Sequence, residues 1–537
     1  MKRKEFIKLM SMAGVGAPFV LNGMPTRFMN SFLDVQATCS EVNDRVLVIL
    51  RMAGANDGLN TVIPINQYDT YANLRPTIKI ANTGASSYIP LDTTVASTKQ
   101  VGLHPVMTGF KSLYDSGKMT LLNGVGYPNP NYSHFRSENL MFAGKDGSTS
   151  QDLPDGIFGR YLGSLFPGLS GNPTIANPDP LAIQLGNLNP CLFYEHNTEK
   201  NIEYNLSGFQ GTLFNQLSIV PSEYNDLLNY IGGVVSSMDA YYNRVMQVFN
   251  TGSNSTVTYP NSNLGKQLKT VARMIQGGSK TKIFQVNIGG FDTNVNQIQS
   301  GNSALGNHAN LLADISNSVA AFQQDIESLG LGNKILTVTF SEFGRQVREN
   351  ASLGTDHGDL APFFIIGNSV ASGIMGDHPL FRNAKSFYYN QNQRRYDYRQ
   401  IFASLLQDWL GADTALIADT ELETFVAAGQ KIDVVQNAKK ASVVCSALGT
   451  SNVNVSDEIK LYPNPANNFV KLNFGTVKYK KVEISVFDTS GRQILKMNQF
   501  NADKELEINT SNLLNGLYII RIVTDTAEFS KKLVVSH

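Results

Sequence analysis

The stretch Lys-Ile-Phe-Gln-Val-Asn-Ile-Gly-Gly at residues 282–290 decides the fold class, together with Lys-Ile-Leu-Thr-Val-Thr-Phe at residues 334–340. Both are apolar-rich runs of strand length, and two glycines end the first. Between them apolar residues recur three and four positions apart, which predicts one face of a helix: Leu311, Ile315, Val319, Phe322, Ile326 and Leu329. Strand, helix and strand in this order predict a βαβ unit of a parallel sheet.

The same alternation of strand-like and helical patterns extends outward over most of the chain. We predict an α/β domain over residues 45–426, built on a mostly parallel sheet flanked by helices. Residues 427–457 are polar, lack a strong period and are predicted to be a linker. Beyond them, short alternating runs separated by turns predict a small all-β, immunoglobulin-like sandwich over residues 458–537.

The charges of the 537 residues balance, with 44 basic and 44 acidic side chains. No net field therefore draws the chain to nucleic acid or to an anionic membrane, and no nucleic-acid partner is expected. The three cysteines, Cys39, Cys191 and Cys445, supply neither a disulfide framework nor a zinc cluster.

The N-terminus has the features of a targeting segment. A positive patch at residues 2–4 precedes a short, mostly apolar run from Leu9 to Leu21, which is too short to span a bilayer comfortably. We predict a signal peptide over residues 1–25, similar to the twin-arginine type with lysine in place of its second arginine. A tail over residues 26–44 follows, and the mature chain is expected to have no transmembrane segment.

The C-terminal sandwich carries an ordered set of motifs: Tyr462-Pro463-Asn464-Pro465-Ala466, Val486-Phe487-Asp488 with Gly491-Arg492, Leu514-Asn515-Gly516-Leu517-Tyr518 and Lys531-Lys532-Leu533-Val534-Val535. In order and spacing this set resembles the type A sorting domain of the type IX secretion system. The resemblance implies a Bacteroidetes-type bacterium and the secretion machinery as a partner through residues 458–537. It also implies delivery to the cell surface or beyond by way of the periplasm. The alternative is an adhesive domain that the mature protein retains.

Acidic side chains lie beside four of the predicted strands: Asp57, Asp292 and Glu342 follow strands, and Asp356 and His357 precede one. In an open parallel sheet, functional groups gather at the carboxyl ends of the strands. Carboxylates joined by histidine are ligands for divalent metal ions, so these five residues are predicted to form a metal site of open identity. Taken singly, each acid has a structural interpretation as a turn, a helix cap or an ion-pair partner.

Residues 45–411 resemble the bacterial "domain of unknown function 1501" family, commonly placed near the alkaline phosphatase and sulfatase superfamily. The motifs that carry the resemblance are Gly54-Ala55-Asn56-Asp57-Gly58-Leu59-Asn60, Leu103-His104-Pro105, Ser133-His134-Phe135, Phe291-Asp292-Thr293, Ser341-Glu342-Phe343-Gly344-Arg345, Gly354-Thr355-Asp356-His357-Gly358 and Asp397-Tyr398-Arg399. The resemblance implies an alkaline phosphatase-like fold and metal-dependent hydrolysis of phosphate or sulfate esters. Ser133 is then the candidate nucleophile and Arg345 the candidate ligand of the anionic ester. A hydrogen-bonding loop serine and an arginine that only neutralises Glu342 are the alternatives.

One departure from the family pattern separates two functional hypotheses. Relatives usually have Asp-Thr-His where this chain has Asp292-Thr293-Asn294, and an amide is a poorer ligand than imidazole for a zinc-like ion. His308 is a candidate replacement. An exported hydrolase with one or two metal ions is the first hypothesis, and a non-catalytic surface or binding protein on a degenerate phosphatase-like fold is the second.

The expected ligand is a small anionic ester or a glycan. The segment that runs from Tyr388-Tyr389 to Arg394-Arg395-Tyr396 is suited to stacking on sugars or nucleotides, or it is a solvated loop.

Overall fold

The structure is a computed structural model that describes residues 19–21, 24–28, 43–150, 153, 155–166, 177–186, 243–381, 387–389, 393–427, 429–441, 460–474, 479–488, 493–502, 505–524 and 528–537. The chain divides into two compact units, residues 1–446 and 447–537. Most of the predicted signal peptide and tail, the C-terminal part of the predicted linker and the three cysteines lie outside the described residues.

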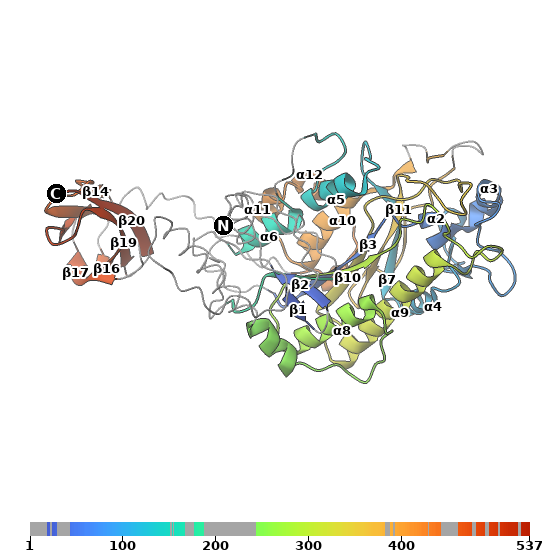
Figure 1. Ribbon diagram of the computed structural model, residues 1–537, viewed down its shortest axis with the longest axis horizontal. Coiled ribbons are helices and arrows are strands. Elements are labelled where there is room, and N and C mark those ends of the chain that lie inside the picture. Colours follow the sequence, from blue (N-terminus) through green and yellow to red (C-terminus); the bar gives the residue numbers. More distant parts are fainter. Residues whose placement is uncertain are drawn as a thin grey trace, which may run out of the picture. The chain divides into compact units, whose positions relative to one another are not determined.

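The first unit is built on a ten-stranded sheet (Figure 1). Its order is β1 (Phe19–Leu21), β2 (Met24–Phe28), β8 (Ala182–Leu185), β9 (Ile283–Gly289), β3 (Val46–Ala53), β10 (Ile335–Phe340), β11 (Ala361–Ile366), β7 (Met119–Gly126) and β12 (Gly373–Met375), and β13 (Tyr396–Asp397) also pairs with β7. Within this sheet all strands except β2 and β11 run in one direction. The predicted α/β class with a mostly parallel sheet is therefore confirmed.

The predicted βαβ unit is present as β9, α9 (Asn307–Ser328) and β10. Its two strands are not adjacent, because β3 lies between them and pairs in parallel with both. The helix begins earlier than the first apolar position of the pattern, since its N-terminal turn follows Gly306.

Helices cover both faces of the sheet (Figure 1) and bury a separate core on each. Alternate residues of β3 divide between the cores, since Leu47 and Ile49 belong to one and Val48 and Leu50 to the other. The first core is completed by α5 (His134–Ala143), α6 (Ile157–Leu165), α10 (Tyr398–Ser404), the π-helical turn η5 (Leu405–Trp409) and α11 (Thr414–Asp419). The second is completed by α4 (Thr108–Asp115), α8 (Asn263–Gln276) and α9.

Shorter elements complete the unit. They are a small sheet of β4 (Val62–Pro64), β6 (Val101–Leu103) and β5 (Ile89–Pro90), the helices α2 (Gly58–Thr61), α3 (Tyr68–Leu74) and α12 (Glu423–Val426), and the 3-10 turns η1 (Ile65–Gln67), η2 (Ser97–Lys99) and η6 (Asn437–Lys439). In the part of the chain that the structure describes, no helix is both long and apolar enough to cross a membrane.

Five loops that adjoin the central strands lie at the same edge of the large sheet. The carboxyl ends of β9, β3, β10 and β7 all lie there because these strands run in the same direction. Strand β11 runs the opposite way, so its N-terminal loop, residues 354–360, reaches the same edge. The acids that the sequence places after three strands and before a fourth therefore come from neighbouring loops.

The second unit is a two-sheet, all-antiparallel sandwich, as predicted. One sheet is β14 (Lys460–Tyr462), β15 (Phe469–Asn473) and β18 (Glu505–Asn509), and the other is β17 (Gln493–Ala502), β16 (Tyr479–Asp488), β19 (Gly516–Thr524) and β20 (Glu528–Val535). The opening motif is tied to β20, since Val534 N donates to Asn464 Oδ1 at 2.8 Å and Ala466 N donates to Val534 O at 2.7 Å. Its Ala466 is fully buried.

Candidate metal centre

Two histidines and one aspartate meet at the loop edge of the sheet. His134 begins α5, in the loop region after β7; Asp292 follows β9; His357 precedes β11. One ligand atom from each residue lies within 4.8 Å of the other two, and among the described residues this trio is the group of acids, histidines and cysteines that could hold a metal ion. We call His134, Asp292 and His357 the metal trio.

The Nδ1 atom of each of the two histidines lies within hydrogen-bond distance of an acceptor. His134 Nδ1 lies 2.7 Å from Glu342 Oε1, and His357 Nδ1 lies 2.8 Å from the carbonyl oxygen of Tyr132. A carbonyl and an ionised carboxylate only accept, so both Nδ1 atoms carry the proton. Both Nε2 atoms then present a lone pair in the neutral rings, as metal-ligating histidines do when outer partners fix their tautomer.

The three ligand atoms are spaced as ligands around one small cation are. The two Nε2 atoms are 3.1 Å apart, and Asp292 Oδ1 lies 3.3 Å from that of His357 and 3.5 Å from that of His134. Bonds of roughly 2.0–2.1 Å to a tetrahedral ion place neighbouring ligands about 3.3–3.4 Å apart. The trio therefore fits a single divalent ion with no rearrangement larger than a few tenths of an ångström.

Glu342 contacts the trio through the ring of His134. Its side chain is buried, and Oε1 accepts from Gly54 N at 2.8 Å as well as from His134. Burial alone raises the pKa of Glu342, but the hydrogen bonds from His134 and from Gly54 N–H hold it below the usual value. The same hydrogen bond raises the pKa of His134. Glu342 therefore keeps the proton on Nδ1 of His134, and its own carboxylate is not one of the three grouped ligand atoms.

Gly54 lets two loops approach closely enough to build the site. Its φ is +113°, and a Cβ added there would lie 2.3 Å from Asp292 N. Only glycine meets both conditions, the backbone angle and the missing side chain. The loop after β3 thus contacts the start of the loop that carries Asp292.

Arg345 clamps these loops with all of its donors. Nε donates to Ala55 O at 2.7 Å, Nη1 donates to Asn294 Oδ1 and Thr355 O, and Nη2 donates to Gly54 O, Phe291 O and Asp292 Oδ1. The guanidinium is fully buried. Burial raises the pKa of Asp292, but the hydrogen bond and charge of Arg345 outweigh it and lower that pKa. This arrangement leaves no N–H of Arg345 for the ester oxygen that the sequence-based prediction assigned to it.

Asp57 lies apart from the trio, although the sequence predicted it to be a metal ligand. Its carboxylate is fully buried and pairs with Arg75 Nη1 at 2.6 Å, and Gln297 Nε2 donates to the same Oδ2 at 2.6 Å. Burial opposes ionisation, yet the charge of buried Arg75 keeps the pKa of Asp57 below its usual value. Among the described residues, Oδ1 of Asp57 has no hydrogen-bond partner.

Asp356 and His357 point to opposite sides because their backbone is paired with residues 344–346. Arg345 and His357 form an antiparallel bridge, flanked by the bonds from Gln346 N to Asp356 O and from Gly358 N to Gly344 O. Successive side chains alternate in such a pairing. His357 therefore points toward His134 and Asp292, whereas Asp356 is exposed and accepts from Asn350 Nδ2 at 2.8 Å.

Ser133 immediately precedes α5 and is exposed. Its backbone N–H donates to Asn131 Oδ1 at 2.8 Å, but its hydroxyl contacts no base among the described residues. Both ring nitrogens of the adjacent His134 are already engaged with the site. Within the described residues, Ser133 therefore has no side-chain base to activate its hydroxyl, and its role as nucleophile stays a prediction.

Asn294 and His308 take structural positions. Asn294 Nδ2 donates to Asp292 Oδ1 at 2.6 Å, and its Oδ1 accepts from Arg345. His308 is buried with Nε2 2.9 Å from Asn56 Oδ1, and burial lowers its pKa to about 4. His308 is therefore not a member of the metal trio. The third member of the trio is instead His134, which lies beside the candidate nucleophile in sequence and carries no sequence signal of metal binding.

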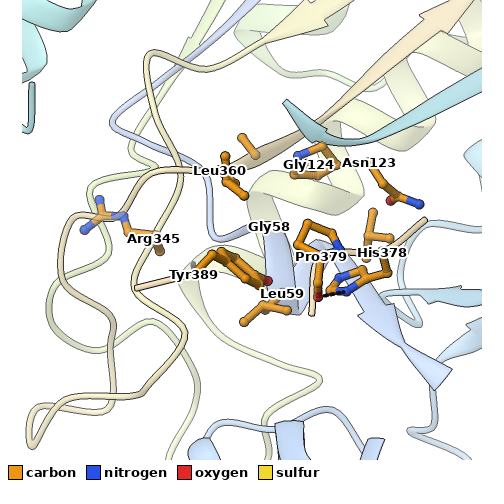
Figure 2. Close-up of a pocket in the computed structure, with 12 residues that line it drawn as sticks. Gly58, Leu59, Asn123, Gly124, Arg345, Leu360, His378, Pro379 and Tyr389 are labelled. Carbon is orange, nitrogen blue, oxygen red and sulfur yellow. Dashed lines mark hydrogen bonds between the residues drawn. The ribbon is translucent and has the colours of Figure 1, made fainter. Parts of the chain in front are cut away.

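A pocket of about 330 Å³ of empty volume, part of it open to solvent, is lined in part by Arg345. Its lining includes Asn123, Leu360, His378 and Tyr389, but no member of the metal trio. Figure 2 shows the Arg345 guanidinium pointing away from His378 and Tyr389. Burial lowers the pKa of His378 to about 4, so this ring is neutral near pH 7. The pocket is separate from the trio.

The matches to known families agree with this division into two units. Residues 460–536 match the secretion system C-terminal sorting domain. The resemblance noted from the motifs of the sandwich is thus confirmed, and a sorting domain of this kind indicates export to the cell surface or beyond. Residues 249–415 match the family described as protein of unknown function (DUF1501), which confirms the second resemblance over that part of the chain. No curated protein is similar enough in sequence to count as a match.

Solved structures show only distant likeness. A protein in the alkaline phosphatase superfamily from Vibrio parahaemolyticus shares 9% identity at a TM-score of 0.29, with 100% of this chain and 92% of that chain covered. The lipoteichoic acid synthase LtaP from Listeria monocytogenes shares 10% at 0.29, covering 76% and 80%, and Ps i-CgsB in complex with k-i-k-neocarrahexaose shares 10% at 0.31, covering 87% of each. Likenesses at this level carry nothing about the site or its activity.

Proposed function

We propose that this exported chain is a hydrolase of phosphate or sulfate esters that uses one divalent metal ion held by His134, Asp292 and His357. The observation that carries the proposal is the approach of two lone-pair-bearing Nε2 atoms to 3.1 Å beside a carboxylate oxygen. Two imidazoles select a borderline metal ion such as Zn²⁺ over Ca²⁺ or Mg²⁺, and three protein ligands leave a coordination position open, as in catalytic sites.

The charges of the site suit an anionic substrate once the ion is bound. Asp292 and Glu342 contribute two negative charges and Arg345 one positive charge, so the protein groups sum to one negative charge. A divalent ion reverses the sign. It would act as a Lewis acid on an ester oxygen and activate water. The family resemblance of the chain adds the ester class, since it implies relatives among phosphatases and sulfatases.

The protein's own residues hold the ligands in place. Glu342 and the Tyr132 carbonyl keep the protons on the Nδ1 atoms, and Phe343 stacks on the His134 ring with centroids 4.9 Å apart. Arg345 orients Asp292. Because no base contacts the hydroxyl of Ser133 within the described chain, the proposed nucleophile is water.

Elemental analysis of the purified chain, followed by a panel of phosphate and sulfate monoesters and diesters, tests the proposal. Asp292→Asn and His357→Ala are expected to lose both the metal and turnover, whereas Asp356→Asn, which alters an exposed carboxylate next to His357, keeps both. A proton on His134 Nε2 would link the same three atoms without a metal. A chain that stays metal-free after incubation with Zn²⁺, Mn²⁺, Fe²⁺ or Co²⁺ would therefore overturn the proposal.

A non-catalytic binding protein is the second candidate, and two observations favour it. Every Arg345 donor is used within the protein, and no base contacts the Ser133 hydroxyl among the residues that the structure describes. On this alternative the metal trio binds an anionic ligand without cleaving it. Metal-dependent retention of esters with no release of phosphate or sulfate by the loaded protein would select the second candidate.

A further inference from the structure

Two exposed tyrosines stack beside the metal trio. The rings of Tyr132 and Tyr388 have centroids 5.4 Å apart and planes 28° apart, and each side chain is 38% exposed. Tyr132 comes from the loop that leads into α5, and Tyr388 from a segment whose backbone pairs with Val347 through Phe387 O. We call Tyr132 and Tyr388 the tyrosine platform.

The platform is joined directly to the metal trio. The carbonyl oxygen of Tyr132 accepts from His357 Nδ1 at 2.8 Å, and the Tyr132 ring meets Phe343 edge to face at 6.4 Å. Phe343 in turn stacks on His134. A molecule whose reacting group lies at the trio therefore has the platform within reach of its next few atoms.

Further exposed rings flank the platform in sequence. Phe135, one residue after His134, is 79% exposed, and Phe387 is 52% exposed with Arg348 over its face at 5.4 Å. Exposed large apolar side chains that are grouped indicate a ligand surface, whereas single ones are common, and the grouping that carries the inference here is the stacked pair Tyr132 and Tyr388.

We propose that the tyrosine platform binds a sugar ring, so that the ester cleaved at the metal trio is carried on a glycan; this inference rests on the proposed function for its catalytic part only. A pyranose has an apolar C–H face that packs on an aromatic ring and a hydroxyl edge that bonds to polar groups. The tyrosine pair can supply both contacts, since each side chain is 38% exposed although the rings stack on each other, and the Tyr388 hydroxyl already accepts from Gln346 Nε2 at 3.2 Å.

Charge separates a sugar from a nucleotide here. A base would stack on the same rings, but its phosphates need a basic groove along the backbone. The chain is neutral overall, every Arg345 donor bonds within the protein, and Arg348 lies over the ring of Phe387. A neutral or lightly charged glycan therefore fits better than a polynucleotide.

Binding measured without catalysis tests the platform independently of the hydrolase proposal. The full chain is screened on a broad glycan array and then titrated by calorimetry with neutral hexasaccharides such as cellohexaose, maltohexaose and chitohexaose, and with nucleoside monophosphates. Tyr388→Ala is expected to weaken saccharide binding about ten-fold, and Tyr388→Phe to retain most of it. Phe469→Ala is the matched control, because it removes a ring of similar exposure, 41%, from the C-terminal unit.

The saccharide-binding proposal and the hydrolase proposal can fail independently of each other. Loss of saccharide binding in Tyr388→Ala with normal metal content supports the platform, even in a chain that turns over no ester. Turnover of small alkyl esters with no binding to any glycan on the array overturns the platform and leaves the hydrolase standing. Preferential binding of nucleoside monophosphates, or equal saccharide binding by wild type and Tyr388→Ala, overturns it as well.

Discussion

His134 Nε2 and His357 Nε2 face each other at 3.1 Å, while the Nδ1 atom of each ring is held by an acceptor. Two lone pairs at this distance repel unless a proton or a metal ion lies between them. The side chains are 223 positions apart in sequence, and each is 27% exposed. The fold therefore brings two candidate metal ligands together where solvent can reach them.

Glu342→Gln tests the support of this pair. An amide accepts more weakly than a carboxylate and carries no charge, so the tautomer and basicity of His134 are less well fixed. We expect metal affinity to fall by roughly 10–100-fold without being abolished. Competition with a chelator measures the affinity, and Asp356→Asn serves as the control with unchanged affinity. An unchanged affinity in Glu342→Gln would show that the hydrogen bond from His134 is not part of the metal site.

Asp57→Asn separates a structural role from a ligand role. The buried guanidinium of Arg75 would lose its charged partner, and breaking a buried pair in this way costs about 3–5 kcal/mol of the free energy of unfolding. Denaturant unfolding followed by the fluorescence of Trp409, the chain's one tryptophan, reports on the α/β unit. Asp115→Asn, which breaks the exposed pair with Lys111, is expected to cost less than about 1 kcal/mol.

The metal content of folded Asp57→Asn is expected to equal that of the wild type. A variant that unfolds normally but has lost its metal would instead make Asp57 a ligand, as the sequence suggested.

Ser133→Ala tests the choice of water as the nucleophile. Because the Ser133 hydroxyl contacts no base in the described chain, we expect kcat on the best ester to stay within about three-fold of the wild-type value, well short of the 10²–10⁴-fold typical of lost acid–base groups. Mass spectrometry of the quenched reaction provides a second measurement, with no phosphoryl or sulfuryl adduct expected. A trapped adduct on Ser133 would restore it as the nucleophile.

Lys282→Met tests a pH dependence of stability. Burial of the Lys282 ammonium, which donates to Asn43 O, lowers its pKa to about 8 from roughly 10.4 in the unfolded chain. The folded state then binds fewer protons between these values, so this lysine opposes folding below pH 8 and its cost is relieved as pH rises toward 10.4.

The variant is therefore expected to be more stable than wild type at pH 7, by up to about 3 kcal/mol, and the difference to shrink toward pH 10. Tryptophan-monitored unfolding at several pH values measures both. A difference that is constant with pH would show that Lys282 does not titrate in this range.

The backbone of both units follows from patterns that are local in sequence. The apolar period of residues 311–329 and the runs that flank it predict β9, α9 and β10, since burial on one face or two leaves a visible period. The placement of β3 between β9 and β10, and the antiparallel course of β11, are set by pairing across hundreds of residues. No local pattern encodes either.

The candidate site was predictable only in part for the same reason. Asp292 and His357 follow from their places beside strand ends. His134 does not, because a helix-start histidine beside a serine carries no metal-binding signal until the fold brings Glu342 under one nitrogen and His357 against the other. Asp57 and Asp356 are predicted as ligands only because they lie next to strands in the sequence. In the structure, Asp57 instead pairs with Arg75, and the alternation of side chains along the paired backbone turns Asp356 away from the trio.

The bonds between Asn464, Ala466 and Val534 make the first motif of the sorting unit depend on β20. Its first motif is completed only when β20 has been made, because the partner of that motif is the last strand of the sheet. A translation product that stops before β20, or a chain clipped there, leaves Ala466 and the sandwich interior open to water. Because the β20 residues Leu533 and Val535 belong to the single core of the sandwich, loss of this strand is expected to unfold the whole sorting unit rather than to shorten it by one strand.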